Sequence, residues 1–190
     1  RGALQAIGAE VHAVCDLNEA DLEKAKSDLG ARKAFTDFEQ MLDEERLDTV
    51  LIGTPMQFHV PQSIIALERG VHVLSEVTAG VSVEECKDLV VATEKSDAMY
   101  MLSENYCYIK GNIFVKALVG AGLFGEVYYA EGEYLHDVTE LGETTPWRRH
   151  WQLGIRGITY CTHSLGPILQ WFQGDRVGKV CCEDSGSHYM

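Results

Sequence analysis

The chain is short of basic residues and has no long apolar run. Its 16 Lys and Arg stand against 29 Asp and Glu, a formal net charge of −13. Phosphate binding depends on basic side chains, so we expect no nucleic-acid partner. No stretch approaches the roughly 18–20 consecutive apolar residues of a membrane-spanning helix, so we expect no membrane partner. The 190 residues, 46% of them hydrophobic, are enough for one globular domain and part of a second.

The six cysteines also lack the spacing of a metal site or a disulfide framework, because no CxxC pair occurs. The adjacent Cys181 and Cys182 would point to opposite faces of a strand, which does not suit a shared metal ion. We therefore expect reduced thiols, no metal and a cytoplasmic location. The chain begins at Arg1 without a methionine, so the question of an upstream export signal stays open.

The most informative stretch is one in which apolar runs end in polar residues. Residues 50–52 are apolar and stop at Gly53, which predicts a parallel strand buried on both faces. A helix over residues 60–67 closes at Gly70, and residues 71–74 predict the next strand. Ligands of open α/β sheets bind outside the carboxyl ends of the strands. We therefore expect one crevice to be lined by Thr54, Pro55, His59 and Glu76.

The same alternation continues on both sides of this stretch. Strands are predicted over residues 11–14 and 99–102, and helices are predicted over residues 19–29, 38–42 and 83–93, with Asn18 and Ser82 as N-caps. Alternating strands and helices imply a doubly wound parallel sheet, a Rossmann-type α/β fold. We assign residues 1–106 to this dinucleotide-binding domain. Glu104 and Asn105 follow the last strand and are added to the predicted cofactor site.

The pattern changes after residue 107, where we expect a second α/β domain over residues 107–190. A helix over 109–119 precedes an alternating stretch at 127–134, which predicts an antiparallel strand. A polar, aromatic loop leads to a helix over 158–172 that is interrupted at Gly166-Pro167, and residues 177–182 begin another strand. One strand and a fragment make a poor sheet, so this open, mainly antiparallel domain is expected to be incomplete.

Asp16 ends the first strand, where a dinucleotide fold places the acid that binds the adenine ribose. A carboxylate at this point repels a 2′-phosphate, which favours NAD over NADP as the cofactor. The glycine-rich turn that normally comes before this acid is absent from the sequence. We expect it, with its strand, upstream of Arg1, and residues 3–8 to be the end of the helix that follows it.

Aromatic and polar residues in the second part predict a carbohydrate site. Trp147 and Trp151 flank two arginines and a histidine, and aromatic rings with hydrogen-bonding neighbours suit sugars. Tyr160 and His163 stand three apart, so they share a helix face. His163 is the better proton-transfer group, and Tyr160 is a partner if its pKa falls. The predicted catalytic residues are His163 and Tyr160, and the predicted substrate residues are His136, Trp147, Arg148 and His150.

Several of these motifs together resemble the glucose-fructose oxidoreductase / inositol dehydrogenase (Gfo/Idh/MocA) family: Ala13-Val-Cys-Asp16, Gly53-Thr-Pro55 to His59, Ala66-Leu-Glu-Arg-Gly70 and His72-Val-Leu-Ser-Glu76. The resemblance implies an N-terminal Rossmann domain followed by an α/β domain with the substrate site. Family dehydrogenases follow the Glu with Lys-Pro, where this chain has Val77-Thr78. They also carry an Asp four residues before the catalytic His, where this chain has Thr159.

One branch without the Lys is more similar, the NAD-dependent α-N-acetylgalactosaminidases. The motifs that carry this similarity are Tyr134-Leu-His-Asp137, Trp147-Arg-Arg-His150, Tyr160-Cys-Thr-His163 and Leu165-Gly-Pro167. The branch implies transient oxidation of a sugar at C3 by bound NAD, elimination at C1, addition of water and return of the hydride. Which of His163 and Tyr160 serves C3 and which serves C2 stays open.

Two other functions remain as alternatives. The first is a conventional NAD-dependent sugar or polyol dehydrogenase, and the second is a non-catalytic NAD-binding sensor. The presence of Tyr160, His163 and the aromatic loop favours an enzyme. We expect a small carbohydrate as the substrate and a homo-oligomer for the full-length protein.

Overall fold

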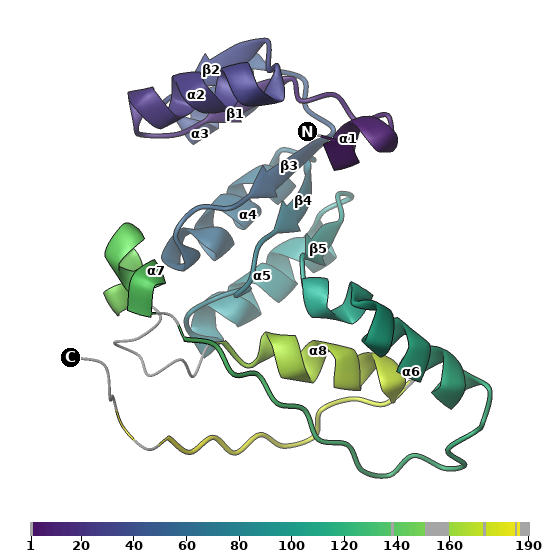
Figure 1. The fold of residues 1–190 in the computed structure, drawn as a ribbon. Helices are drawn as coiled ribbons and strands as arrows, with labels where there is room; N and C mark the ends of the chain where they lie inside the picture. The colour runs from purple at the N-terminus through teal and green to yellow at the C-terminus, as the bar shows by residue number, and fades with distance from the viewer. Residues whose placement is uncertain (1, 138, 151–159, 173, 185, 187–190) are drawn as a thin grey trace.

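The computed structural model of the protein describes residues 2–137, 139–150, 160–172, 174–184 and 186. Every strand pair in these residues is parallel (Figure 1). β1 (Ala13–Cys15) pairs with β2 (Lys33–Phe35), and β3 (Thr49–Ile52), β4 (His72–Ser75) and β5 (Tyr100–Leu102) form a second sheet in that order. The predicted α/β class with a parallel sheet is confirmed, although the short strand β2 was not predicted.

The helices follow the strands in the expected alternation. The first half contains α1 (Gly2–Ala6), α2 (Glu19–Leu29), α3 (Phe38–Glu44), η1 (Met56–Phe58), α4 (His59–Glu68) and α5 (Val83–Lys95). The second half contains η2 (Asn105–Tyr108), α6 (Lys110–Gly120), α7 (Thr139–Thr144) and α8 (Thr162–Trp171).

Local capping explains why the first-half helices begin and end where the sequence predicts. The Asn18 side chain accepts a hydrogen bond from the Ala20 N–H at 3.0 Å, and the Ser82 hydroxyl accepts one from the Glu85 N–H at 3.1 Å. Each cap satisfies a backbone donor that has no partner inside the helix. Gly30 ends α2 with φ 73°, a left-handed conformation that glycine adopts without steric cost.

One apolar core joins the middle of the fold. It holds residues from α3, β3, α4, β4 and α5 together: Met41, Leu42, Val50, Ile52, Val60, Ala66, Leu67, Val71, Val73, Leu89 and Ala98. Burial of this apolar area is the main stabilising term for the region. The core fixes the ends of β3 and β4 relative to α4, and these ends lead into Thr54, Pro55 and Glu76, which are predicted to bind the cofactor.

The other face of the three-stranded sheet is less covered than predicted. Leu51 of β3 is 60% exposed and Met101 of β5 is 48% exposed, while Leu74 of β4 stands between them in register. Core residues alternate with these side chains along β3, so the prediction of a strand buried on both faces is wrong here. The reason is that α4 and α5 pack on the face that carries Val50 and Val73.

The two sheets are separate units, and β1 and β3 are not hydrogen-bonded to each other. The strand order typical of dinucleotide-binding folds has one further strand between these two groups. This is the place expected for the strand that carries the glycine-rich turn.

The second half departs more from the predicted pattern. No strand is assigned to residues 127–134 or 177–182, although both segments lie within the described ranges. They run in Figure 1 as long coils beside α8 and below it, without a ladder partner. A strand exists only through pairing with a neighbour, so alternation in the sequence alone did not determine these elements. The predicted boundary at residues 106/107 stays a prediction.

Helix α8 is continuous where an interruption was predicted. It runs from Thr162 to Trp171 with Pro167 inside, and the expected turns over 158 and 159 lie outside the described residues. Pro167 lacks the N–H that would bond to the His163 carbonyl, but only that one helical bond is lost. Contacts of α8 with η2 and α6 hold the helix in place.

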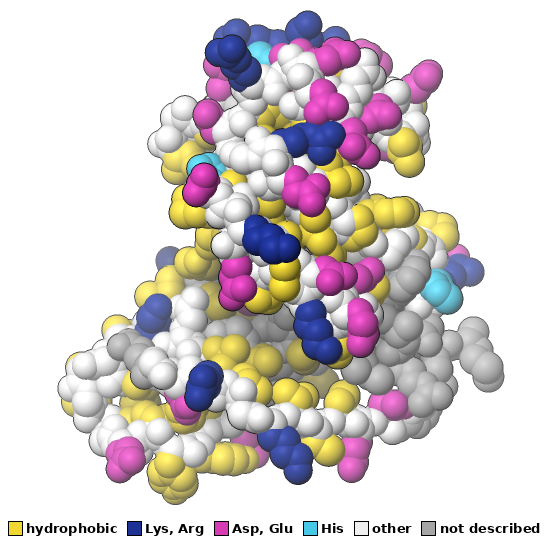
Figure 2. All heavy atoms as spheres, turned by 180° about the vertical axis from the view of Figure 1, so that it is seen from behind, with side chains coloured by type: hydrophobic (Ala, Val, Ile, Leu, Met, Phe, Trp, Pro, Cys, Tyr) yellow, Lys and Arg dark blue, Asp and Glu magenta, His cyan; other side chains and the backbone are white. Residues whose placement is uncertain are grey.

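Acidic side chains are numerous over the upper part of the molecule, with Lys and Arg side chains beside them (Figure 2). None of the helices in the described ranges is long and apolar enough to cross a bilayer. The residues that the structure describes also contain no group of three His, Cys, Asp or Glu placed to hold a metal ion.

Candidate active site

His163 forms a buried pair with Glu104, which comes from a distant part of the chain. His163 lies in the first turn of α8, and Glu104 caps η2 directly after β5. His163 Nδ1 is 2.7 Å from Glu104 Oε1, and both residues are only 6% exposed. A carboxylate oxygen can only accept, so Nδ1 carries the hydrogen in this contact. In the neutral ring this leaves Nε2 as the nitrogen that can take a proton.

Glu104 is itself held in position by the backbone. Its Oε1 also accepts a hydrogen bond from the Tyr106 N–H at 3.0 Å. Its second oxygen, Oε2, is buried without a hydrogen-bond partner in the described residues. Burial makes this carboxylate costly unless it is paired. The histidine is the partner that offsets this cost.

Three tyrosine rings surround the imidazole of His163. The Tyr106 ring is stacked on it, with the centroids 4.4 Å apart and the planes at 21°. Tyr134 and Tyr160 meet it at steep angles of 65° and 86°, with centroids 4.7 Å and 5.0 Å away. Aromatic faces are negative and attract a neighbouring positive charge. The cluster therefore suits a histidine that holds a proton during a reaction.

Two glycines allow these segments to approach so closely. A Cβ atom added at Gly166 of α8 would lie 2.6 Å from Glu104 Cγ and 3.1 Å from Cys107 Sγ. A Cβ added at Gly132 would lie 3.0–3.1 Å from Ile168 and Ser164 of α8. Any larger residue would push η2 or the extended segment 131–134 away from α8. The His163 cluster depends on the absence of these side chains.

Burial raises the pKa of the Tyr160 hydroxyl, and the nearby Tyr134, Glu104 and Glu76 raise it further, while Arg148 opposes them. Burial likewise raises the pKa of Tyr134. Both phenols therefore remain protonated at neutral pH and can donate a hydrogen bond or a proton. The condition under which Tyr160 would serve as a base, a lowered pKa, is not met.

The ends of the three paired strands place the predicted cofactor residues along one edge. Ile52, Ser75 and Leu102 stand next to one another in the sheet. Thr54, Pro55, Glu76, Glu104 and Asn105 follow these strand ends. Glu76 and Asn105 are exposed, and the Glu76 N–H is bonded to the Ile52 carbonyl. The edge also contains Gln57, whose side-chain oxygen is buried without a partner in the described residues. A bound polar group could satisfy that oxygen, so this edge fits a nucleotide.

Asp16 stands apart, at the end of β1 in the other sheet. Its carboxylate accepts a hydrogen bond from the Asn18 N–H at 2.8 Å and faces solvent. An exposed carboxylate with one oxygen still open fits the predicted contact with a ribose hydroxyl.

His59 is a buried residue that contacts two turns of the candidate site. It is 2% exposed, with Nδ1 at 2.7 Å from the Thr78 carbonyl and Nε2 at 2.7 Å from the Thr54 carbonyl. The ring thus ties the turn after β3 to the turn after β4. Both ring nitrogens lie against backbone oxygens, so His59 holds these two turns in place, and its predicted contact with the cofactor stays a prediction.

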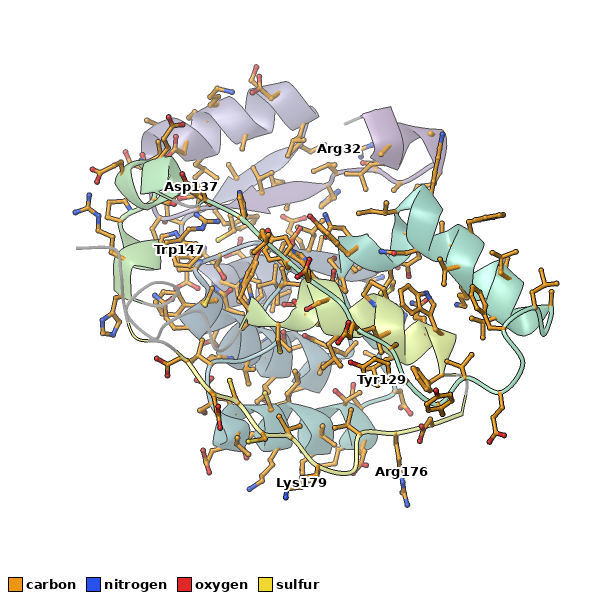
Figure 3. All side chains as sticks on the ribbon, turned by 60° about the horizontal axis from the view of Figure 1, so that its bottom comes forward. Arg32, Tyr129, Asp137, Trp147, Arg176 and Lys179 are labelled. Carbon is orange, nitrogen blue, oxygen red and sulfur yellow. The ribbon has the colours of Figure 1, made fainter. Side chains whose placement is uncertain are left out.

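The predicted substrate residues are brought together only in part. His136 Nδ1 lies 2.7 Å from the Tyr134 hydroxyl, so His136 joins the cluster around His163. Arg148 lies over the Trp147 ring at 4.2 Å and interacts electrostatically with Tyr160. Trp147 and Asp137 both lie at the α7 side of the molecule, far from Arg176 and Lys179 (Figure 3). His150 is exposed, and Trp151 and Thr159 lie outside the described residues.

Sequence reasoning did not select Tyr106 or Tyr134 as site residues. Tyr134 stands two residues before His136, so in an extended segment the two side chains lie on the same side. That spacing could have identified Tyr134 as a candidate site residue beside His136. Tyr106 follows Glu104 by two residues, but only the turn of η2 brings its ring over His163.

Residues 2–104 match a family model described as "Oxidoreductase family, NAD-binding Rossmann fold". A glycosyl hydrolase family 109 protein of Shewanella woodyi is 34% identical over 186 residues, covering 89% of this chain and 40% of the relative. An α-N-acetylgalactosaminidase of Shewanella oneidensis is 31% identical over 186 residues, which again cover 89% of this chain and 40% of the relative. The chain thus spans about 40% of the length of these curated relatives.

Solved structures agree with this match. The WlbA dehydrogenase of Bordetella pertussis, in complex with NADH and UDP-GlcNAcA, gives a TM-score of 0.70 at 26% identity, over 78% of this chain and 43% of that one. The scyllo-inositol dehydrogenase of Lactobacillus casei with bound NAD(H) and scyllo-inositol gives a TM-score of 0.59 at 28% identity, over 62% of this chain and 35% of that one. The chain belongs to the Gfo/Idh/MocA oxidoreductase family, so the resemblance stated above is confirmed, and NAD is the cofactor in the family's description.

Proposed function

From this family membership we propose that the chain forms the NAD-binding part, and the beginning of the catalytic part, of an enzyme that acts on a carbohydrate. The observation that carries the proposal is the buried His163–Glu104 pair, which stands beside the strand ends expected to bind NAD. A buried histidine with one nitrogen fixed by a carboxylate is the usual arrangement of a general base.

His163 takes the proton of a sugar hydroxyl on Nε2. Glu104 keeps the hydrogen on Nδ1, so that Nε2 presents its lone pair. When the proton arrives, the positive charge of the ring is offset by the Glu104 carboxylate and the faces of the surrounding tyrosines. NAD, when bound, supplies the acceptor for the hydride that leaves the same carbon.

Tyr160 acts as a donor rather than a base. Burial raises the pKa of its hydroxyl, so the phenol keeps its proton at neutral pH. It can donate a hydrogen bond to a substrate oxygen while His163 accepts a proton. This division of roles is our proposal for the question that the sequence left open.

Among carbohydrate reactions, we favour the redox-neutral glycosidase of the α-N-acetylgalactosaminidase type. The curated relatives at 31–34% identity carry that name or that of its glycosyl hydrolase family. Val77 and the buried Thr78 occupy the positions after Glu76, so no ammonium group stands at this strand end to assist a dehydrogenase. The conventional dehydrogenase is the second candidate, favoured by the names of the structural neighbours.

The experiment is incubation of the full-length protein with NAD and a panel of aryl glycosides and free sugars. Phenol release without net NADH supports the glycosidase, and NADH accumulation supports the dehydrogenase. Tight NAD binding without either product supports the sensor. His163→Gln should abolish whichever product appears, whereas His12→Gln, at the far sheet, should not.

The cofactor proposal has its own test, because Asp16 is expected to reject a 2′-phosphate. Calorimetry on the full-length protein should give tighter binding of NAD than of NADP. Asp16→Ser should reduce this preference by about tenfold or more, since like charges brought together cost several kcal/mol. Equal or tighter binding of NADP by the unsubstituted protein would contradict the assignment. The homo-oligomer and the cytoplasmic location stay predictions.

A further inference from the structure

Tyr106 transfers no proton in the proposed chemistry, yet its backbone is fixed at both ends next to the site. Its N–H donates to Glu104 Oε1 at 3.0 Å, and its carbonyl accepts a hydrogen bond from the Asn112 side chain at 2.7 Å. The residue lies in η2, immediately after the strand end that carries Glu104. The direction in which its side chain leaves η2 is therefore tightly set.

The ring of Tyr106 covers one face of the His163 imidazole. The two ring planes are 21° apart, and the ring centroids are 4.4 Å apart. The Tyr106 and Tyr134 rings meet edge to face, with an interplanar angle of 86° and centroids 5.4 Å apart. Tyr134 and Tyr160 meet the imidazole at steep angles, so neither is stacked on it. Among the three tyrosines, Tyr106 alone lies nearly parallel to the ring.

The Glu104 hydrogen bond by itself leaves one motion of His163 free. A ring held at Nδ1 can still rock about its Cβ–Cγ bond within the range of angles that a hydrogen bond tolerates, and this rocking changes the direction of Nε2. A stacked ring opposes this rocking, because tilting the imidazole would separate the two faces. Glu104 at the N-cap of η2 thus holds one nitrogen of the ring, and Tyr106 within η2 holds its plane.

We propose that Tyr106 is a positioning residue that sets the plane of the His163 imidazole and so aims Nε2 at the substrate hydroxyl. This inference rests on the proposed role of His163 as the base. It requires the aromatic face of residue 106 and not its hydroxyl.

Three variants of the full-length protein separate the face from the hydroxyl and from general damage. Tyr106→Met fills similar space without an aromatic face, Tyr106→Phe keeps the face, and Tyr108→Leu is the control. Tyr108 lies in the same short helix, is 58% exposed and has no part in the cluster. Tyr106→Met should lower kcat by roughly 2- to 12-fold with little change in KM, the range expected for loss of one aromatic pair. The kcat of Tyr106→Phe and of Tyr108→Leu should stay near that of the unsubstituted protein.

A nuclear magnetic resonance measurement tests the same point without any turnover. The ring protons of His163, assigned by their loss in His163→Gln, should be shifted upfield by the Tyr106 face. The shift should disappear in Tyr106→Met and remain in Tyr106→Phe. If no sugar substrate is ever turned over but the shift behaves in this way, the proposed function fails and the stacking stands.

Among folded variants, two results would overturn the proposal. One is an unchanged His163 shift and unchanged kcat in Tyr106→Met, and the other is an equal loss of kcat in Tyr106→Phe and Tyr106→Met. If Tyr106→Met does not fold, Tyr106→Leu replaces it with the same expectations. If both fail to fold while Tyr106→Phe and Tyr108→Leu fold, residue 106 serves stability and the proposal is rejected.

Discussion

Residues 2–104 and residues 105–186 are built on different principles. In the first region α2, α3 and α5 begin at side-chain caps, and the core joins consecutive strands and helices. The second region is held by contacts between positions 59 residues apart: the His163–Glu104 pair, which joins it to the first region, and the Trp171–Asn112 hydrogen bond within it. Local signals therefore organise the first region, while long-range contacts organise the cluster around His163.

The largest expected effect comes from removing the proposed base, His163. His163→Ala should lower turnover by about 10²–10⁴-fold, the usual contribution of a general acid–base group. NAD affinity should hardly change, because the predicted cofactor residues, apart from Asn105, belong to the first region. Steady-state kinetics and calorimetry on the same preparation check both parts. Near-normal turnover, or loss of folding in circular dichroism, would favour a purely structural histidine.

The next effect concerns the carboxylate that links the two regions. Glu104→Gln keeps the shape of the side chain but removes the charge opposite a protonated His163. We expect a fall in kcat of about 5- to 150-fold, which corresponds to roughly 1–3 kcal/mol for a disrupted buried hydrogen-bond partner. Kinetics of Glu104→Gln and of the exposed control Glu94→Gln would test this. Equal activities of the two variants would refute the role of Glu104.

Much of the first region was predictable because its signals are local. Asn18, Ser82 and Gly30 mark helix ends through bonds and backbone angles that depend on a few adjacent residues. The short strand β2 was missed because residues 33–35 show no clear apolar run, and it forms only by pairing with β1. The exposure of Leu51 was also missed, since burial depends on what covers a face and not on the residue itself.

The sequence selected His163, Tyr160 and Glu104 as candidate site residues by their types, and these roles stay predictions. It could not show that Glu104 pairs with His163. Nor could it show the stacking of Tyr106, because the approach of η2 to α8 depends on Gly166. The alternation over residues 127–134 predicted a strand that has no partner in the described ranges.

Packing between the regions can be tested with two glycines in helices. Gly166→Ala would place a Cβ 2.6 Å from Glu104 Cγ, whereas a Cβ at Gly111 of α6 meets nothing within 4 Å. We expect Gly166→Ala to lower the free energy of unfolding by about 1–3 kcal/mol. Gly111→Ala should be neutral or stabilising by up to about 1 kcal/mol. Denaturant titration measures both, and equal effects would contradict the close approach of α8 to η2.

The smallest effect is an acid-dependent one confined to the first region. The hydrogen bond from Arg69, at 2.7 Å, lowers the pKa of the exposed Asp43 carboxyl. A carboxyl with a lowered folded-state pKa stabilises the protein above its ordinary pKa, and this stabilisation is lost as the pH falls through the folded-state value. Asp43→Asn should therefore be slightly less stable than the unsubstituted chain at pH 7, and the gap should close in acid. Thermal melts from pH 7 to pH 3 measure this difference in stability, with Glu23→Gln as the control. A difference that grew as the pH fell would contradict the lowered pKa of Asp43.

The direct test of the central claim is the position of the hydrogen on the His163 ring. Nitrogen-15 magnetic resonance of the histidine-labelled full-length protein separates a protonated ring nitrogen from one with a free lone pair. In the neutral ring, Nδ1 should carry the hydrogen toward Glu104 and Nε2 should have the free lone pair. Glu104→Ala should remove this preference. A neutral ring with the hydrogen on Nε2 would contradict the account, because His163 could then not take a proton from a sugar hydroxyl at that nitrogen.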